Sequence, residues 1–214
     1  KSISLNQNIS NFEREFEKSL KNLNRDKIYS LMFHNAKDLK RKNIEKFIFL
    51  LENFKKKKII YKYGLSAYEL DDVEYACKNF NFEIFQIPIN LFNLSSIELK
   101  KILNLKSKYK LELHGRSLFL QGLITNKDKR LPRKFNIIET NRDLLLKEAK
   151  LNNLNPSHLI MNKIDNLNVI DVAIIGLENI KNYREMITYK KKKLKKNNTN
   201  YYIHDKKITD PRRW

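Results

Sequence analysis

The stretch 59-IIYKYGLSAYELDDVEYACKNFNFEIFQIPIN-90 decides the fold. Its first apolar run, 59–66, is closed by Gly64 and Ser66 and is typical of a buried strand. A helical pattern over 69–80 follows, and a second apolar run, 84–90, is stopped by Pro88. A strand, a helix and another strand in this order predict two parallel strands joined by a crossover helix.

The same alternation continues on both sides of this stretch. Phe12, Phe16, Leu20 and Leu23 fall on one helical face, which predicts a helix over 10–23 with Ser10 or Asn11 as its N-cap. Further strands are expected at 28–33, 110–114 and 170–176, further helices at 43–57, 96–107 and 179–188, and a helix-rich region at 139–165. The chain is therefore predicted to be an α/β protein with five strand, loop and helix repeats.

These repeats fit either an open doubly wound sheet or a barrel. No glycine-rich dinucleotide fingerprint follows any predicted strand, which argues against a Rossmann unit. Polar residues stand at the strand ends, as in barrels: His34, Ser66, Gln86 with Asn90, Arg116 with Ser117, and the turn after Gly176. A complete barrel has eight strands, so the sequence predicts a partial TIM (β/α)8 barrel, about the last five β/α units, with the first three strands missing.

The composition is that of a folded protein with a strong positive charge. The chain has 214 residues, 41% of them hydrophobic, and a formal net charge of +20. Lysine, asparagine and isoleucine are abundant, as expected from an AT-rich coding sequence, so the charge alone is weak support for nucleic-acid binding. The lysine runs 55–58 and 190–196 are interpreted as a helix C-terminus and an exposed tail.

Cysteine usage and hydropathy bear on the cellular compartment. The single cysteine, Cys77, excludes an internal disulfide and fits a reducing cytoplasm. No apolar run is long enough to predict a membrane span. The first residue is Lys1 and no signal segment follows it, so we expect either a processed chain or a fragment.

Several of the predicted strand ends resemble those of the aldo/keto reductases, in the family's order and at similar spacings. The segments that carry the resemblance are 28-IYSLMFHNAKDL-39, 63-YGLSAY-68, 85-FQIPINLFN-93, 115-GRSLFLQGLI-124, 131-LPRKF-135 and 174-IIGLENIKNYREM-186. The resemblance runs from about Ser10 to Ile187, and the RSLFLQGLI segment and the terminal 210-DPRRW-214 are most similar to a bacterial branch. It implies a barrel that binds NADPH or NADH without a Rossmann domain and reduces the carbonyl of an aldehyde, ketone or sugar derivative.

The family uses a catalytic tetrad of Asp, Tyr, Lys and His, and the resemblance places part of it on this chain. The histidine falls on His34 and the lysine on Lys1, whereas the aspartate and the tyrosine would precede the first residue. In the family, the tyrosine is the general acid, the lysine and aspartate lower its pKa, and the histidine orients the carbonyl. We therefore expect residues 1–214 alone to be inactive.

The resemblance also implies the contacts with the cofactor. Ser66 and Gln86 match the ligands of the nicotinamide carboxamide, although Ala67 stands where the family usually has Asn. Arg116 takes the place of an aromatic ring that stacks on the nicotinamide, which a planar guanidinium can replace. The loop around the pyrophosphate matches Ser117, Leu118, Gln121 and Gly122.

The last predicted helix would present its N-terminus to the adenosine phosphate. The contacts implied there are Gly176, Asn179, which is also the expected N-cap, and Asn182. Glu178 occupies the place of a basic residue that reads the 2′-phosphate of NADPH, and Lys181 or Arg184 could compensate, so the choice between NADPH and NADH stays open. No metal ligands are expected.

We expect residues 1–189 to form the aldo/keto reductase-like barrel portion and residues 190–214 a basic C-terminal tail. The leading hypothesis is an NAD(P)H-dependent oxidoreductase whose partners are the cofactor and a small carbonyl substrate, without membrane or nucleic acid. The alternatives are a non-catalytic, cofactor-binding relic and a basic α/β nucleic-acid-binding protein. Exposed aromatic rings on a sheet would favour the latter, whereas the Phe and Tyr residues mostly follow core periods. The substrate and the oligomeric state stay open.

Overall fold

The computed structural model describes residues 2–3, 9–125, 133–195 and 199–214. The chain forms two compact units: residues 1–87 with 103–113, and residues 88–102 with 114–214. The order of the strands follows the order of the chain from β1 to β6. The recorded pairs β1–β2, β2–β3, β3–β4 and β5–β6 are all parallel, as the alternation of strands and helices predicted.

Strands and helices alternate throughout the first unit. Its elements are β1 (Ser2–Ile3), α1 (Ile9–Asn22), β2 (Ile28–Phe33), the 3-10 helix η1 (Ala36–Lys40), α2 (Ile44–Lys56), β3 (Ile60–Ser66) and α3 (Leu70–Asn79). Three further elements, β4 (Ile84–Pro88), α4 (Ser96–Tyr109) and β5 (Glu112–Arg116), have residues in both units.

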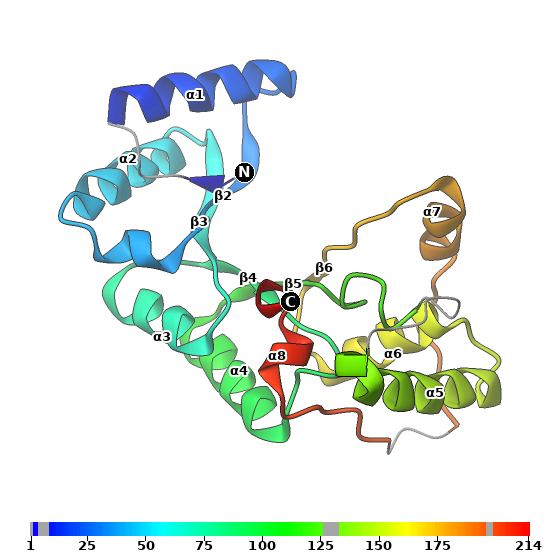
Figure 1. Ribbon diagram of the computed structural model, residues 1–214. Coiled ribbons are helices and arrows are strands. Elements are labelled where there is room, and N and C mark those ends of the chain that lie inside the picture. The colour runs from blue at the N-terminus through cyan, green and yellow to red at the C-terminus, as the bar shows by residue number, and fades with distance from the viewer. Residues whose placement is uncertain (1, 4–8, 126–132, 196–198) are drawn as a thin grey trace. The chain divides into compact units, whose positions relative to one another are not determined.

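The helical face that predicted α1 is the face that it buries. The Phe12 ring meets Phe47 of α2 at 5.7 Å between centroids, and Phe16 meets Phe54 at 5.0 Å. Figure 1 shows these two helices side by side. The helix begins at Ile9, so Ser10 already lies in its first turn and the expected cap at Ser10 or Asn11 is wrong.

The strands of the first unit form an apolar core against the helices. The largest fully buried side chains of the unit include Phe33 of β2, Tyr63 of β3 and Phe85 of β4. Phe82, just before β4, joins them, because its ring lies 5.7 Å from Phe33 and 5.5 Å from Tyr63. Aromatic burial of this kind accounts for much of the core of a small unit.

The second unit is mostly helical. Its further elements are the 3-10 helix η2 (Arg133–Phe135), α5 (Asn136–Leu151), α6 (Pro156–Leu167), β6 (Val172–Ala173), α7 (Ile180–Ile187), α8 (Lys206–Thr209) and the 3-10 helix η3 (Pro211–Arg213). Helix α6 starts with a proline at its first turn and ends at Asn168, whose φ of 52° is left-handed, so both ends follow ordinary capping chemistry. The helix-rich region expected at 139–165 is thus two helices.

Five predicted strands are present, and β1 adds a sixth. The strand expected at 170–176 is reduced to Val172–Ala173, which pairs with His114 and Gly115 of β5. Strand β6 is the last in the order, and among the described residues it is paired with β5. Within the described residues, β6 and β1 are not hydrogen-bonded to each other.

The segment that follows Thr199 packs onto the second unit. Tyr201 and Ile203 are buried, and the Ile203 amide donates a 2.9 Å hydrogen bond to the Phe92 carbonyl. The Asn141 side chain on α5 donates to the Tyr201 carbonyl at 2.9 Å. The division into a barrel portion and a separate basic tail stays a prediction, and these residues supply part of the core of the unit.

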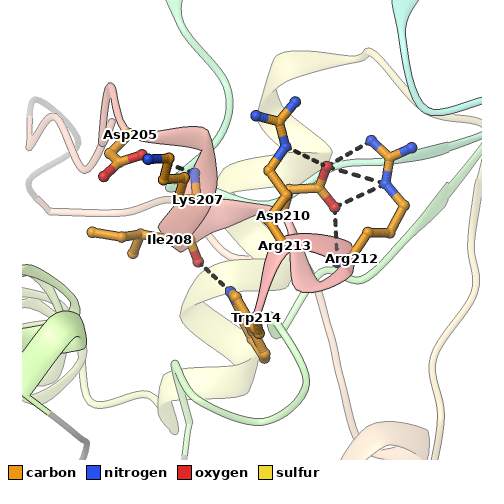
Figure 2. Close-up of polar contacts among 7 residues, drawn as sticks. All are labelled: Asp205, Lys207, Ile208, Asp210, Arg212, Arg213 and Trp214. Atoms are coloured by element: carbon orange, nitrogen blue, oxygen red, sulfur yellow. Dashed lines mark hydrogen bonds and ion pairs between the residues drawn. The ribbon is translucent and has the colours of Figure 1, made fainter.

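The last ten residues form two short helical turns around aspartate caps. Asp205 accepts from the Lys207 amide at 2.8 Å, and Asp210 accepts from the Arg212 amide at 3.1 Å. Figure 2 shows the Asp210 carboxylate between the guanidinium groups of Arg212 and Arg213, and the Trp214 indole N–H donating to the Ile208 carbonyl. Burial alone raises the pKa of Asp210, but hydrogen bonds from Arg212 outweigh it, so the net pKa lies below its usual value.

Candidate functional site

Three of the predicted site residues stand in one row across neighbouring strands of the first unit. Phe33 of β2 is in register with Leu65 of β3, and Ser66 of β3 is in register with Gln86 of β4. His34 directly follows Phe33, so it comes next in line with Ser66 and Gln86. Parallel strands end at the same edge of a sheet, and the row His34, Ser66 and Gln86 therefore lies at the carboxyl edge where barrels carry their active sites.

The side chains of this row have their polar atoms available. His34 is exposed, and Ser66 and Gln86 are half-buried. Within the described part of the chain, none of the three side chains makes a hydrogen bond, whereas the backbone around them is tied down: the Ala67 amide donates to the Gln86 carbonyl at 2.9 Å. A hydroxyl, an amide and an imidazole at the end of a fixed ladder can all bind a polar ligand.

Gly64 lets β3 lie unusually close to β4 below this row. A Cβ at Gly64 would lie only 1.7 Å from the Ile84 carbonyl oxygen, far inside any contact that a real Cβ makes. Only glycine can occupy this position without moving the two strands apart. The separation of Ser66 and Gln86 therefore depends on Gly64.

The turn after His34 is fixed by short polar side chains. The Asn35 side chain accepts a 3.0 Å hydrogen bond from the Lys37 amide and so caps η1. Asp38 is buried and forms an ion pair with Arg41 at 3.0 Å. These contacts fix the backbone of the turn just beyond His34.

The strand that carries Arg116 is shifted from its expected position. The sequence predicted a strand over 110–114, but Lys110 adopts a left-handed φ of 52° and the Leu111 amide still donates to the Lys106 carbonyl of α4. Because the helix ends this late, β5 covers Glu112–Arg116 and Arg116 is its last residue rather than part of a following loop. The Arg116 carbonyl accepts from the Ile89 amide at 2.9 Å, which anchors this strand end in the second unit.

The loop after Arg116 has an unusual backbone. Ser117, Leu120, Gln121 and Gly122 all have positive φ. Leu118, Leu120 and Ile124 are buried, so the loop is packed by its own apolar residues. The backbone amides of Leu118, Phe119, Gln121 and Gly122 donate no hydrogen bond within the described residues. Free amides on a loop with left-handed turns can bind an anion.

Helix α7 carries the remaining predicted residues. Asn179 is its N-cap, as predicted, because its side-chain oxygen accepts from the Asn182 amide at 2.9 Å. The segment around it, including Gly176 and Glu178, is exposed, and a Cβ at Gly176 would meet no atom within 4 Å. This helix terminus is therefore open to a ligand.

Two other polar residues have structural roles. The Asn90 side-chain oxygen accepts from the amides of Phe92 and Asn93 at 3.0 and 3.1 Å, so Asn90 fixes the turn after β4. His114 is buried within β5. Lys1, the candidate catalytic lysine, lies outside the described residues.

The sequence missed one buried ionic cluster in the second unit. Lys163 of α6 forms a 2.8 Å ion pair with Glu148 of α5, and the Tyr201 hydroxyl donates to the same carboxylate. Burial alone raises the pKa of Glu148, but hydrogen bonds from Lys163 and Tyr201 outweigh it and lower the net pKa. Burial and the bond to Glu148 raise the pKa of Tyr201. The sequence did contain a signal for this cluster, because Glu148 and Lys163 stand among the apolar residues on one face of their helices.

No group of three or more His, Cys, Asp or Glu side chains in the described part of the chain could hold a metal ion. None of the helices formed by the described residues has the length and hydropathy needed to cross a membrane.

Parallel strands with crossover helices, and polar residues at their carboxyl ends, define part of a (β/α)8 barrel. The fold is similar to that of the aldo-keto reductase AKR11C1 from Bacillus halodurans in its apo form, with a TM-score of 0.67 and 16% identity over 86% of this chain and 62% of that one. It is also similar to the glycerol dehydrogenase AKR11B4 from Gluconobacter oxydans, with a TM-score of 0.66 and 17% identity over 83% of this chain and 57% of that one.

The model of the aldo/keto reductase family matches residues 3–203. The chain therefore belongs to the aldo/keto reductase family. It spans about three fifths of the length of the similar structures, since it covers 62% of AKR11C1. No curated protein matches the chain.

Proposed function

We propose that this chain is the larger part of an NAD(P)H-dependent reductase that acts on the carbonyl of an aldehyde, a ketone or a sugar derivative. The observation that carries this proposal is the row His34, Ser66 and Gln86 at the carboxyl edge of three parallel strands. Membership of the aldo/keto reductase family supports it, because the resemblance assigns these three residues to catalysis and to the nicotinamide carboxamide.

The residues present fit a nicotinamide cofactor. A carboxamide has an acceptor oxygen and donor N–H groups, and Ser66 and Gln86 supply both kinds of partner from side chains that make no other hydrogen bond in the described residues. In the second unit, the free amides of the 117–122 loop suit a pyrophosphate, and the exposed N-terminus of α7 beside Asn179 suits a further phosphate. When bound, the cofactor would supply the hydride.

The other predicted contacts complete this proposal. Arg116 would stack its guanidinium on the nicotinamide, Ser117 and Leu118 would line the pyrophosphate loop together with Gln121 and Gly122, and Asn182 would face the adenine. Glu178 beside the α7 terminus would oppose a 2′-phosphate, while Lys181 would attract it, so both NADPH and NADH remain in the proposal.

The role of the chain's own residues in catalysis is to orient and polarise the substrate. His34 would donate a hydrogen bond to the substrate carbonyl oxygen and hold it beside the nicotinamide site, which stabilises the charge that develops on that oxygen. Lys1 would pair with the general acid, a tyrosine that the family resemblance places upstream together with its aspartate. We propose that residues 1–214 bind cofactor but do not turn over alone, because the proton donor is not among them.

Titration of the 214-residue chain with NADH and with NADPH, followed by nicotinamide fluorescence, tests the proposal. All the proposed cofactor contacts lie within this chain, so at least one cofactor should bind. Gln86→Leu should weaken binding about fivefold to tenfold, the value of one lost neutral hydrogen bond. His204→Ala is the control, because this exposed side chain lies outside the row, and it should leave cofactor binding unchanged.

The outcomes separate clearly. If the folded chain binds neither cofactor, or if Gln86→Leu binds as tightly as the parent, the proposed site is wrong. NAD(P)H-dependent reduction of an aldehyde by residues 1–214 alone would instead disprove the assignment of the general acid to a residue outside this chain.

A further inference from the structure

The amino-terminal edge of the strands in the first unit combines exposed aromatic rings with lysines. Tyr29 of β2 and Tyr61 of β3 are 51% and 45% exposed, and their ring centroids lie 6.4 Å apart with a tilt of 34°. Large exposed rings on neighbouring strands are not explained by core packing, since they leave apolar faces in water. We call this pair the tyrosine platform.

A lysine ammonium lies over each ring of the platform. Lys27 is 5.7 Å from the centroid of Tyr61, and Lys62 is 5.7 Å from the centroid of Tyr29. The hydrogen bond and charge of Tyr61 raise the pKa of Lys27, so this lysine stays charged at neutral pH. The rings and the charges therefore act at the same place.

The backbone brings a run of further lysines beside the platform. Helix α2 ends at Lys56, Lys57 is its C-cap, and Lys58 turns the chain with a left-handed φ of 58°. The Ile59 carbonyl then accepts from the Ile28 amide at 2.9 Å, which joins this turn to the segment that carries Lys27. The lysine run 55–58, interpreted from sequence as a helix C-terminus, therefore also lines the edge that carries the platform.

The acidic residues near this edge are neutralised. Glu112 forms an ion pair with Lys62 and accepts from the Tyr29 hydroxyl, and Glu83 forms an ion pair with Lys55 at 2.5 Å. Asp26 lies beside Lys27 and is the remaining acid of the edge segments. Arg25, Lys56, Lys57 and Lys58 are exposed. The edge therefore presents a net positive charge to solvent.

We propose that this edge binds single-stranded nucleic acid, with bases stacked on the tyrosine platform and phosphates beside Lys27 and the exposed lysines 56–58. Stacking on an aromatic ring accepts any base, and a positively charged groove or edge tracks the backbone, so the two features together define a sequence-tolerant single-strand site. A duplex hides its base faces and gains nothing from exposed rings. The edge is opposite to the carboxyl edge that carries His34, so this activity is separate from carbonyl reduction.

Fluorescence anisotropy with a labelled oligothymidylate of about 12 nucleotides and its abasic counterpart tests the stacking part. Tyr61→Ala should weaken binding of the oligothymidylate at least about fivefold, the lower limit for one stacked base, and should leave binding of the abasic strand unchanged. Tyr61→Phe keeps the ring and should keep the affinity. Tyr183→Ala is the matched control, because Tyr183 is 48% exposed on α7, and it should have no effect.

The charge part is tested by the dependence of affinity on salt. The double change Lys56→Gln and Lys57→Gln should reduce the magnitude of the negative slope of log affinity against log salt by about 1.4, at about 0.7 for each phosphate that the protein no longer neutralises. The double change Lys190→Gln and Lys193→Gln removes the same charge from the second unit and should reduce the magnitude of the salt slope less.

Four results would overturn the proposal. The first two are no binding of the oligothymidylate, and equal affinities of Tyr61→Ala and Tyr183→Ala for it. The others are equal salt slopes for the two lysine double variants, and a loss of affinity in Tyr61→Ala that is seen with phosphatidylserine vesicles but not with the oligothymidylate. The last result would assign the edge to acidic membranes instead. Circular dichroism of each variant confirms that it is folded before these comparisons are made.

Discussion

Replacing Gly64 with alanine should open the sheet where the candidate site is built. A Cβ at this position would lie 1.7 Å from the Ile84 carbonyl oxygen, and real Cβ atoms do not approach closer than 3.0 Å. The obstacle is backbone, which cannot rotate away as a side chain can. The strands β3 and β4 must therefore separate by more than about 1 Å, which is enough to break ladder hydrogen bonds of normal length.

The cost follows from what that separation removes. Three residue pairs join β3 to β4, from Gly64 with Ile84 to Ser66 with Gln86. At about 0.5–1.5 kcal/mol for each hydrogen bond, loss of the ladder costs about 1.5–4.5 kcal/mol. The alanine also restricts the conformations of the unfolded chain, which offsets up to about 1 kcal/mol of this loss of stability. After that offset we expect a net loss of about 0.5–3.5 kcal/mol, and a fall in Tm of roughly 1–14 °C for a chain of this size.

Thermal unfolding followed by circular dichroism measures this loss, and another glycine provides the control. A Cβ at Gly176 meets nothing within 4 Å, so Gly176→Ala should leave the Tm unchanged or raise it slightly. Gly64→Ala should also weaken NADH or NADPH binding, because Ser66 and Gln86 move apart. If the Tm values of the two variants agree within about 1 °C, the close approach of β3 and β4 does not exist and the reasoning fails.

Three further outcomes are expected. Lys163→Met leaves the buried Glu148 without its cation and should cost about 3–5 kcal/mol in urea unfolding at neutral pH. Lys163 helps to hold the pKa of Glu148 low, so the stability that it provides is present above the pKa of the unfolded chain and is lost as pH falls. An equal cost at pH 4 and pH 7 would contradict this account. Burial and Glu74 raise the pKa of Cys77 to about 11, so at mildly alkaline pH iodoacetamide should alkylate it roughly a hundredfold more slowly than free cysteine, and equal rates would show that the thiol is not shielded. Asn179→Ala removes the cap of α7 at a cost of about 1 kcal/mol. Because α7 buries no residue, amide hydrogen exchange should become faster in residues 180–187 while the Tm hardly changes. Unchanged exchange would show that Asn179 does not stabilise the helix.

The elements of the fold could be read from local patterns. The Phe12 and Phe16 face of α1 and the Asn179 cap of α7 depend on residues a few positions apart, and periodicity reports such relations directly. The boundaries of β5 could not be read in this way. The first residue of β5 depends on where α4 ends, at the left-handed Lys110. The alternating pattern of apolar residues would fit a strand that starts two residues earlier equally well.

The candidate site was predicted residue by residue, but only from the family resemblance. That the row His34, Ser66 and Gln86 exists as a row depends on the register of β2, β3 and β4, which hydrogen bonds between distant segments set. The contribution of Gly64 to that register, through its closeness to Ile84, has no local signature either.

The sequence by itself determined the order of strands and helices and the basic charge of the chain, because these follow from nearby residues and from composition; the resemblance of its strand ends to a known family indicated the barrel. The tertiary structure decided which charges are buried together and which rings are exposed. Lys163, Glu148 and Tyr201 meet only when the C-terminal segment packs back onto α5 and α6. Tyr29 and Tyr61 have the alternation of core residues, but they lie near the first residues of β2 and β3, where about half of each side chain is exposed to water.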